Sequence, residues 1–250
     1  MHSASFDKMM SFFRSYRGQF PTLEGKTRVL EVGSKSYREQ DTYRSIVEDD
    51  REIYTGLDLE AGKNVDIVPS NPYVWEEIAD ASFDVCISGQ TFEHNPFFWV
   101  TACEIARVLV PGGYTCIIAP GGGQVHRFPV DCYRYYPDSW AAIAALAGLE
   151  ISEVYFETDE VALRVKGGRW RDSMLIARKP LQTDEAAARR RQQVVQPFKE
   201  GFGSFEAIGH KYGPAVEDYV ARTKVPPLRA IRQKVGRRIS PFGVLGIYRG

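Results

Sequence analysis

The segment PGGGQVHRFPVDCYRYYPD, residues 120–138, holds the chain's densest set of groups able to carry out acid–base chemistry and to bind a polar ligand. The unperturbed pKa of histidine, about 6.5, suits a general base, so His126 is the predicted proton acceptor and Asp131 is placed to orient it. Arginine binds polar or anionic groups, and tyrosine can stack on a sugar ring. The residues predicted to contact an acceptor molecule are Arg127, Asp131, Tyr133, Arg134 and Tyr136.

A second histidine, His94 in the segment GQTFEH (residues 89–94), is the other candidate for a catalytic base. The pair Glu93–His94 also fits a structural role, because a carboxylate is stabilised near the free N–H groups at the start of the helix expected next. No group of Asp, Glu, His or Cys has the spacing of a metal site along the sequence. The sequence therefore predicts no metal, although a site assembled from distant residues stays open.

Each of these segments follows an expected strand. Residues 83–88 and 114–119 are short and largely apolar, and Trp99 to Leu109 carries apolar residues at helical spacing before a Pro-Gly-Gly turn at 111–113. A strand, a crossover helix and a second strand form a βαβ unit, which binds ligands beyond the carboxyl ends of its strands. Both polar segments are expected at that edge.

Two more candidate ligand-binding residues lie upstream. The strand-like segment TRVLEV (residues 27–32) leads into Gly33, and IYTGLDL (residues 53–59) contains Asp58 near its end. A glycine lets the backbone approach a cofactor closely, and a carboxylate about 20 residues further on can bind a ribose diol. Lys35 and Tyr37 stand where a dinucleotide-binding turn has further glycines, so a pyrophosphate-bearing nicotinamide cofactor is not expected.

Together, the segments FDVCISGQTFEH, EIARVLVPGGY and EVG, with the later Asp58, resemble class I S-adenosylmethionine-dependent methyltransferases of the type 11 group. The resemblance implies S-adenosylmethionine as cofactor. It implies that the cofactor-binding residues are Glu31, Gly33, Ser34, Asp58, Leu59, Asn71, Ser88, Gly89 and Gln90. The pattern HRxPxDxxRxYPD is similar to that of a subgroup associated with polysaccharide and sugar modification, which implies O-methylation of a sugar or glycan-type small acceptor.

The resemblance implies an α/β fold with a doubly wound, Rossmann-like sheet of seven strands, the last of them antiparallel. The third strand is expected at residues 66–68, and a polar insert at 157–172 is expected to arch over the acceptor site. Three parts are expected along the chain: an N-terminal helical cap (1–26), the cofactor-binding domain (27–180) and a helical extension with a basic tail (181–250).

The composition limits the possible partners. The net charge is zero, so no nucleic-acid partner is expected, and the four cysteines lack metal-binding or paired spacing, as in a reducing cytoplasm. No run approaches 18 apolar residues, which predicts a cytoplasmic protein. Residues 219–250 contain eight Lys or Arg and no Asp or Glu. This basic tail predicts either peripheral contact with an anionic membrane or packing on the chain's own body.

The sequence thus favours a methyltransferase with a sugar-like acceptor over two alternatives. The first keeps the reaction but changes the acceptor to a lipid or a natural product, which the apolar N-terminal helix and the basic tail favour. The second is a catalytically inactive regulatory subunit with the same fold. The turn EVGSKSY, which lacks the family's further glycines, favours this alternative, whereas Asp58 and the polar acceptor loop argue against it.

Overall fold

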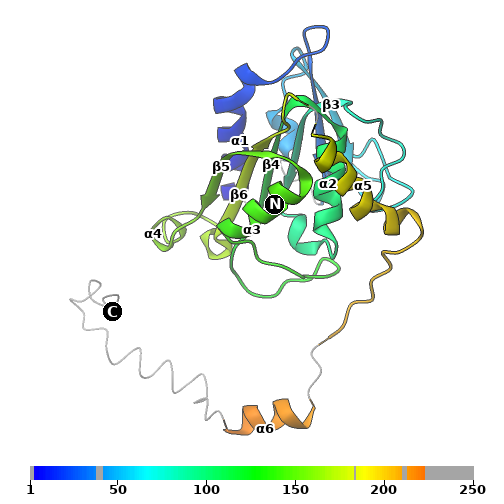
Figure 1. The fold of residues 1–250 in the computed structure, drawn as a ribbon. Helices are drawn as coiled ribbons and strands as arrows, with labels where there is room; N and C mark the ends of the chain where they lie inside the picture. The colour runs from blue at the N-terminus through cyan, green and yellow to red at the C-terminus, as the bar shows by residue number, and fades with distance from the viewer. Residues whose placement is uncertain (1–2, 38–41, 183, 210–212, 223–250) are drawn as a thin grey trace, which may run out of the picture. The chain divides into compact units, whose positions relative to one another are not determined.

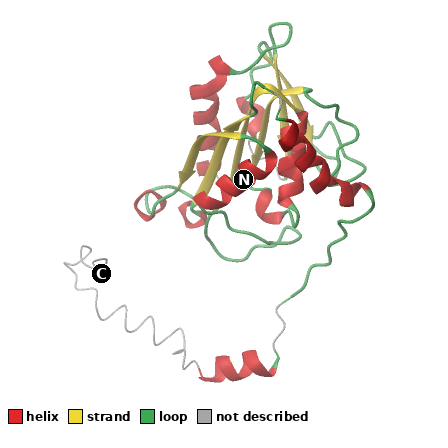
Figure 2. Cartoon of the chain, viewed as in Figure 1, coloured by secondary structure: helices red, strands yellow, loops and turns green. Residues whose placement is uncertain are grey.

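The computed structural model describes residues 3–37, 42–182, 184–209 and 213–222. Its centre is a six-stranded sheet in the order β2-β1-β3-β4-β6-β5 (Figures 1 and 2). The strands are β1 (Thr27–Val32), β2 (Glu52–Leu57), β3 (Phe83–Gly89), β4 (Leu109–Pro120), β5 (Glu150–Phe156) and β6 (Asp172–Arg178). Strands β1 to β4 pair in parallel, and β6 runs antiparallel to both β4 and β5. The expected antiparallel last strand is therefore confirmed.

Helices cover both faces of the sheet. The helices of this body are α1 (Ser3–Tyr16), α2 (Phe98–Val108), α3 (Pro137–Ala147), α4 (Asp159–Ala162) and α5 (Glu185–Lys199). Its 3-10 turns are η1 (Arg17–Gln19), η2 (Tyr43–Ile46), η3 (Phe92–His94) and η4 (Gly168–Trp170). Successive strand residues point to opposite faces, so Val29 and Ile87 pack with α1 while Leu30 and Cys86 pack with α2 and α3 (Figure 1). The result is a three-layer sandwich.

In α3, the helix before β5, single residues set where the helix begins and ends. Pro137 occupies the first turn of α3, where its missing N–H costs no hydrogen bond, and Gly148 ends the helix with φ +71°. A Cβ at Gly148 would lie 2.5 Å from the side chain of Ala187 in α5. The glycine therefore both ends α3 and lets α5 approach it.

The expected third strand at residues 66–68 is wrong, because this segment makes only an isolated bridge between Leu57 and Ile67. The Asp66 carboxylate accepts a hydrogen bond from the Gly56 N–H (2.7 Å), and the N–H groups of Asp66 and Ile67 both donate to the Gly56 carbonyl. The Asp66 carboxylate thus takes the Gly56 N–H that the backbone of a paired strand would bind, and backbone pairing stays limited to the bridge at Ile67. The sheet has six strands among the described residues instead of the expected seven.

Helix α5 packs against the body through its apolar side. Val195 and Phe198 are buried with Tyr73 and Val100, and the Arg190 side chain donates to carbonyls at the end of α3. Helix α5 belongs to one compact unit with the described residues that precede it, and this unit extends to residue 205. Helix α6 (Pro214–Arg222) is described in a second unit, which begins at residue 206. The predicted basic tail beyond residue 222 lies outside the described residues. None of the described helices combines the length and the apolar character needed to cross a bilayer.

Candidate functional site

The loop that follows β1 makes a tight backbone turn beside the carboxyl end of β2. Gly33 has φ +82°, and the N–H groups of Gly33 and Ser34 both donate to the Leu57 carbonyl (2.9 and 3.1 Å). Ser34 is buried. A Cβ at Gly33 would lie 2.1 Å from the Thr91 hydroxyl, so only glycine lets the loops after β1 and β3 come this close.

Asp58 follows β2 at the same edge and is half-buried. The Lys35 N–H donates to its Oδ2 (2.9 Å), which turns the carboxylate toward the loop that follows β1. Leu59, beside it, is 60% exposed. A carboxylate next to an exposed apolar side chain suits a nucleoside, with the ribose hydroxyls on the carboxylate and the base against the apolar surface.

Glu31 is buried within β1, beneath this edge. The Tyr54 hydroxyl donates to its Oε2 (2.7 Å). Burial raises the pKa of Glu31 to about 8; the bond from Tyr54 lowers it, and the nearby negative charge of Asp58 raises it. The Glu31 carboxyl therefore carries a proton at neutral pH in the folded chain.

The end of β3 lies in the middle of the edge. The Ser88 hydroxyl donates to the backbone of β1 (2.9 Å), and a Cβ at Gly89 would lie 2.1 Å from the hydroxyl of Tyr43. Gln90 has φ +57°, and its Nε2 donates to Oδ1 of Asp172 (3.2 Å). The close packing at Gly89 and the turn at Gln90 direct the loop after β3 across the carboxyl ends of its neighbours.

Asn71 is held by contacts within the chain. Its Oδ1 accepts from the Tyr73 N–H (2.9 Å), and its Nδ2 donates to the Phe198 carbonyl (3.0 Å). Both polar groups of this amide are therefore occupied in positioning the loop and α5. These two bonds use one amide hydrogen and one lone pair of Oδ1, so the expected contact between Asn71 and a cofactor stays a prediction.

The loop after β4 is built around the carboxylate of Asp131. Arg134 donates to both of its oxygens (2.5 and 2.8 Å), and the His126 N–H donates to Oδ2 (2.7 Å). Burial raises the pKa of Asp131, but the bonds from Arg134 and His126 outweigh it and hold the pKa below its usual range. Arg134 also donates to the Gln124 carbonyl. The ion pair between Asp131 and Arg134 therefore holds the shape of the loop, because its donors and acceptors bind groups within the loop itself.

The other predicted acceptor residues differ in exposure. The Tyr133 hydroxyl donates to the Pro96 carbonyl (2.9 Å), which ties the loop to the start of α2. Tyr136 is 60% exposed and stacks on Phe156 with ring centroids 5.6 Å apart. Arg127 is exposed. Tyr136 and Arg127 thus present an aromatic face and a cation at the surface of this edge.

The two histidines predicted as alternative bases lie side by side. The ring centroids of His94 and His126 are 4.8 Å apart at an interplanar angle of 77°. Nδ1 of His94 lies 2.6 Å from the Val130 carbonyl, which can only accept, so Nδ1 carries the hydrogen. Burial is the largest influence on His94 and lowers its pKa, against the opposing effect of the Val130 bond.

Glu93 completes this cluster, although the sequence indicated only a structural role for it. Its carboxylate is fully buried, and Oε1 lies 3.6 Å from Nε2 of His94. Burial raises the pKa of Glu93 to about 8. One ligating atom from each of Glu93, His94 and His126 lies within 4.8 Å of the others. The strand order indicates only that the loops after β3 and β4 leave the sheet at the same edge, and nothing in the sequence shows which of their side chains meet.

The insert between β5 and β6 also reaches this cluster. The ring of Trp170 lies 4.3 Å from the ring of His126, centroid to centroid. The N–H groups of Gly121 and Gly122 donate to the carbonyls of Arg171 and Trp170 (3.0 and 2.9 Å), which joins the insert to the loop after β4. Trp170 thus covers one side of His126, and the position of the insert over an acceptor site stays a prediction.

A buried ion cluster at this edge gave no signal in the sequence. Lys8 of α1 donates to Glu157 (3.0 Å) and to Asp172 (3.1 Å), and both carboxylates are buried. Asp172 in turn accepts from Gln90, so α1 is linked to the loop after β3. Lys8 is 149 and 164 residues from its two partners in the chain, which no local pattern can reveal.

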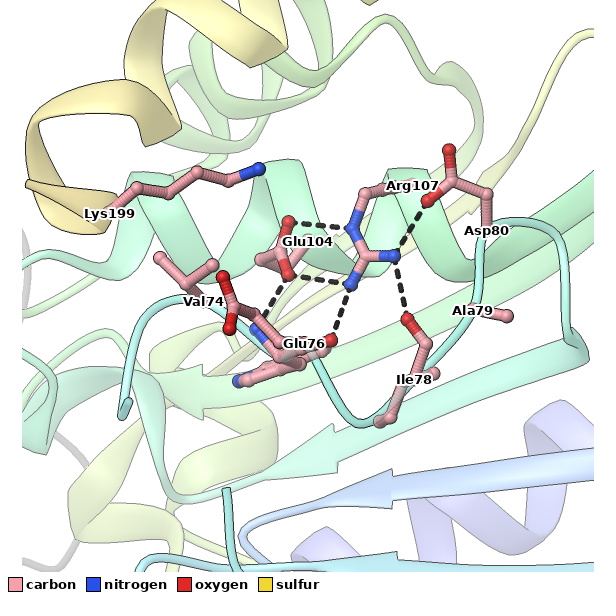
Figure 3. Close-up of a pocket in the computed structure, with 9 residues that line it drawn as sticks. Val74, Glu76, Ile78, Ala79, Asp80, Glu104, Arg107 and Lys199 are labelled. Atoms are coloured by element: carbon pink, nitrogen blue, oxygen red, sulfur yellow. Dashed lines mark hydrogen bonds and ion pairs between the residues drawn. The ribbon is translucent and has the colours of Figure 1, made fainter. Parts of the chain in front are cut away.

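A pocket of about 390 Å³ lies near the amino end of β3, away from the edge just described (Figure 3). Its centre is Arg107, whose guanidinium donates to Glu104, Asp80 and the carbonyls of Trp75 and Ile78. The bonds to Asp80, Trp75 and Ile78 tie α2 to the segment before β3, and those to Glu104 lie within α2. The centre of the pocket is therefore a structural ion network.

Comparison with known proteins agrees with the fold. The family described as "Methyltransferase domain" matches residues 42–117. A curated protein of Mycobacterium sp. (strain JLS), described as an "Uncharacterized methyltransferase", is 31% identical over 115 residues, which cover 41% of this chain and 44% of that protein. The match thus spans less than half the length of this relative.

Solved structures show the same fold. The 1,6-didemethyltoxoflavin-N1-methyltransferase of Burkholderia thailandensis, solved with S-adenosylhomocysteine, aligns over 71% of this chain and 79% of its own, with a TM-score of 0.53 and 16% identity. A protein of Galdieria sulphuraria described as a candidate sarcosine dimethylglycine methyltransferase covers 72% of this chain and 88% of its own, with a TM-score of 0.51 and 16% identity. The expected Rossmann-like methyltransferase fold is confirmed.

Proposed function

We propose that the chain is an S-adenosylmethionine-dependent methyltransferase that methylates an oxygen of a sugar or glycan-type acceptor. The proposal is supported by the methyltransferase-domain match at residues 42–117, by the fold, and by the arrangement of Gly33 and Asp58 at one edge of the sheet. The last observation carries the most weight. It joins a close backbone turn and a diol-binding carboxylate at the carboxyl ends of adjacent strands.

The residues at this edge fit the proposed cofactor. Asp58 would accept hydrogen bonds from the ribose hydroxyls, Leu59 would contact the adenine, and the Gly33–Ser34 backbone would border the methionine part with Gln90. S-Adenosylmethionine has no phosphate, so the glycines missing from this turn are not needed to seat one. When bound, the cofactor supplies an electrophilic methyl carbon.

The loop after β4 and the insert supply the acceptor side. Tyr136 and Trp170 offer aromatic faces, which suit a sugar ring, and the exposed Arg127 suits a polar or anionic substituent. In-line methyl transfer depends on alignment, and a hydroxyl acceptor must also lose its proton. His126 is the proposed proton acceptor because its side chain is 33% exposed against 13% for His94, which stays the second candidate.

Binding of S-adenosylhomocysteine tests the cofactor assignment. Asp58→Ala removes charge-assisted hydrogen bonds, each worth about 1.5–3 kcal/mol, so calorimetry should show at least a roughly tenfold weaker affinity than for the wild type. Asp50→Ala is the matched control, because Asp50 is an exposed carboxylate away from this edge and its loss should leave the affinity unchanged. A wild-type chain that binds no S-adenosylhomocysteine would favour the inactive regulatory subunit.

A second measurement tests the acceptor class. Wild-type chain is incubated with S-adenosylmethionine and with panels of free and nucleotide-linked sugars, phenolic natural products and lipids, and S-adenosylhomocysteine release is followed. Turnover with sugars alone supports the proposal. Turnover confined to the phenolic or lipid panel would replace the acceptor by a natural product or a lipid while leaving the cofactor assignment intact.

A further inference from the structure

We propose that Glu93, His94 and His126 together bind one zinc ion, in a site assembled from the loops after β3 and β4. Glu93 and His94 lie in the 3-10 turn η3 directly after β3, and His126 lies six residues beyond the end of β4. Because β3 and β4 are parallel neighbours, these loops leave the sheet at the same edge. The three side chains bring one carboxylate oxygen and two imidazole nitrogens within 4.8 Å of one another.

The carboxylate of Glu93 is the observation that points to a ligand. It is fully buried, and no other described residue donates a hydrogen bond to either oxygen, its own backbone N–H being the nearby donor. A buried carboxylate without partners is costly, and natural proteins pair such groups or place them on a metal. The neighbouring Nε2 of His94, 3.6 Å away, carries no hydrogen when Nδ1 donates to Val130, so it cannot donate to Glu93 in its neutral form. A cation between them would satisfy both.

The imidazole of His94 is oriented as metal-binding histidines usually are, and His126 has a carboxylate within reach of the same kind of bond. Histidines that bind metal almost always donate their other ring N–H to a carbonyl or a carboxylate. His94 does so through Nδ1 to the Val130 carbonyl at 2.6 Å. Nδ1 of His126 lies 3.5 Å from Oδ2 of Asp131 and 3.5 Å from Nη2 of Arg134, which can only donate. In the zinc-bound state, Nδ1–H would have to donate to Asp131 so that Nε2 is left for the ion. The Trp170 ring, 4.3 Å from His126, shields this side from water.

The donor set selects the kind of metal. Two imidazole nitrogens and one carboxylate suit zinc and other first-row transition metals, whereas magnesium and calcium prefer oxygen ligands alone. With bonds of about 2.0–2.1 Å, the ligand atoms of a tetrahedral zinc site lie roughly 3.4 Å apart. The present spacing of up to 4.8 Å therefore requires a contraction of about 1.4 Å, which the half-buried His126 on its loop is best placed to make. Three protein ligands would leave a fourth position open, as in catalytic zinc sites.

Zinc binding would change the role of His126. A histidine bound through Nε2, with its Nδ1–H on Asp131, has no lone pair left to accept a proton from a hydroxyl. The zinc proposal and the assignment of His126 as a free base therefore describe different states of the same loop. Cofactor binding depends on Asp58 at another part of the edge, so it serves as a separate readout.

Competition with a chromophoric zinc chelator tests the proposal on the full chain. The protein is stripped of metal with dipicolinate, desalted and titrated with zinc chloride, and bound zinc is counted by mass spectrometry. The wild type should bind one zinc ion per chain. Glu93→Gln and His126→Ala should each weaken the affinity by roughly 100-fold, and Asp131→Asn, which removes a group acting through His126, by roughly 10-fold.

Controls separate loss of the site from loss of the fold. Glu93→Gln keeps the size of the side chain without its charge, so its melting temperature should be no lower than that of the wild type and its affinity for S-adenosylhomocysteine should be unchanged. His210→Ala removes a histidine that belongs to no motif and should leave zinc affinity unchanged. A wild type without tight zinc binding, or a Glu93→Gln variant that binds zinc equally well, would overturn the proposal. A wild type that binds zinc but not S-adenosylhomocysteine would overturn the methyltransferase assignment alone.

Discussion

Replacing Glu31 by Gln should stabilise the fold, and the gain should grow with pH. In the folded chain, burial raises the pKa of Glu31 from its ordinary value of 4.5 to about 8. A raised pKa means that the fold favours the protonated carboxyl. The stability that this preference provides is fully present below pH 4.5 and is lost as the pH rises toward 8, because the unfolded chain gives up the proton first.

The size of the effect follows from the same pKa. Each pKa unit corresponds to about 1.36 kcal/mol, so at pH 7 the wild type has lost about 3 kcal/mol relative to its stability at pH 4.5 through Glu31 alone. Glutamine has nearly the same shape, stays neutral, and can still accept the hydrogen bond from Tyr54. The variant should therefore match the wild type near pH 5 and exceed it by about 3 kcal/mol at pH 7.

Urea unfolding of both chains at pH 5, 7 and 8.5, without ligand, gives the free energies to compare. Glu150→Gln is the matched control, since Glu150 is exposed at the start of β5 and its replacement should shift all three values by less than about 0.5 kcal/mol. A difference between Glu31→Gln and the wild type that does not change from pH 5 to 8.5 would refute the assignment of a buried, protonated carboxyl.

Two further predictions concern the C-terminal part of the chain, namely the packing of α5 and the contact made by the basic tail. Phe198→Ala should lower the free energy of unfolding by about 3–5 kcal/mol in urea, because Phe198 is 4% exposed and packs among Tyr73 and Phe97; a loss below about 1 kcal/mol would make α5 an appendage instead of part of the body. A chain shortened after Lys224 should sediment less with anionic liposomes than the full chain, and the full chain's binding should weaken with added salt. Equal sedimentation of the two would argue against the proposed membrane contact of the basic tail.

The parts of the fold that the sequence predicts are those with strong local signals. The strand at 150–156 precedes a polar insert, and α3 lies between Pro137 and Gly148, so both segments have bounds that the residue types themselves impose. The prediction of a third strand was wrong because the Asp66 side chain binds the edge of β2, and a short apolar run does not reveal such a contact. The docking of α5 was missed for a related reason: a helical pattern predicts a helix but not the surface it covers.

The candidate site likewise contains contacts that the sequence predicts and contacts that it does not. Gly33 and Asp58 stand at strand ends that the sequence identifies, so their proximity could be expected. The meeting of Glu93 with His126 could not, because 32 residues separate them and their contact depends on how two loops turn after leaving the sheet. The positive φ of Gln90 starts one of these turns, and the ion pair of Asp131 with Arg134 holds the other.

The strand order assigns different tasks to the two sides of the edge. The proposed cofactor groups follow β1 and β2, the proposed acceptor groups follow β4, and β3 lies between β1 and β4. The loop after β3 must therefore border both ligands, and it does so with different residues: Thr91 packs against Gly33 on one side, while His94 packs against His126 on the other. A change at Thr91 should then act on the cofactor, and a change at His94 on the acceptor. Their three-residue separation makes this loop the physical connection through which binding of one ligand can alter the position of the other.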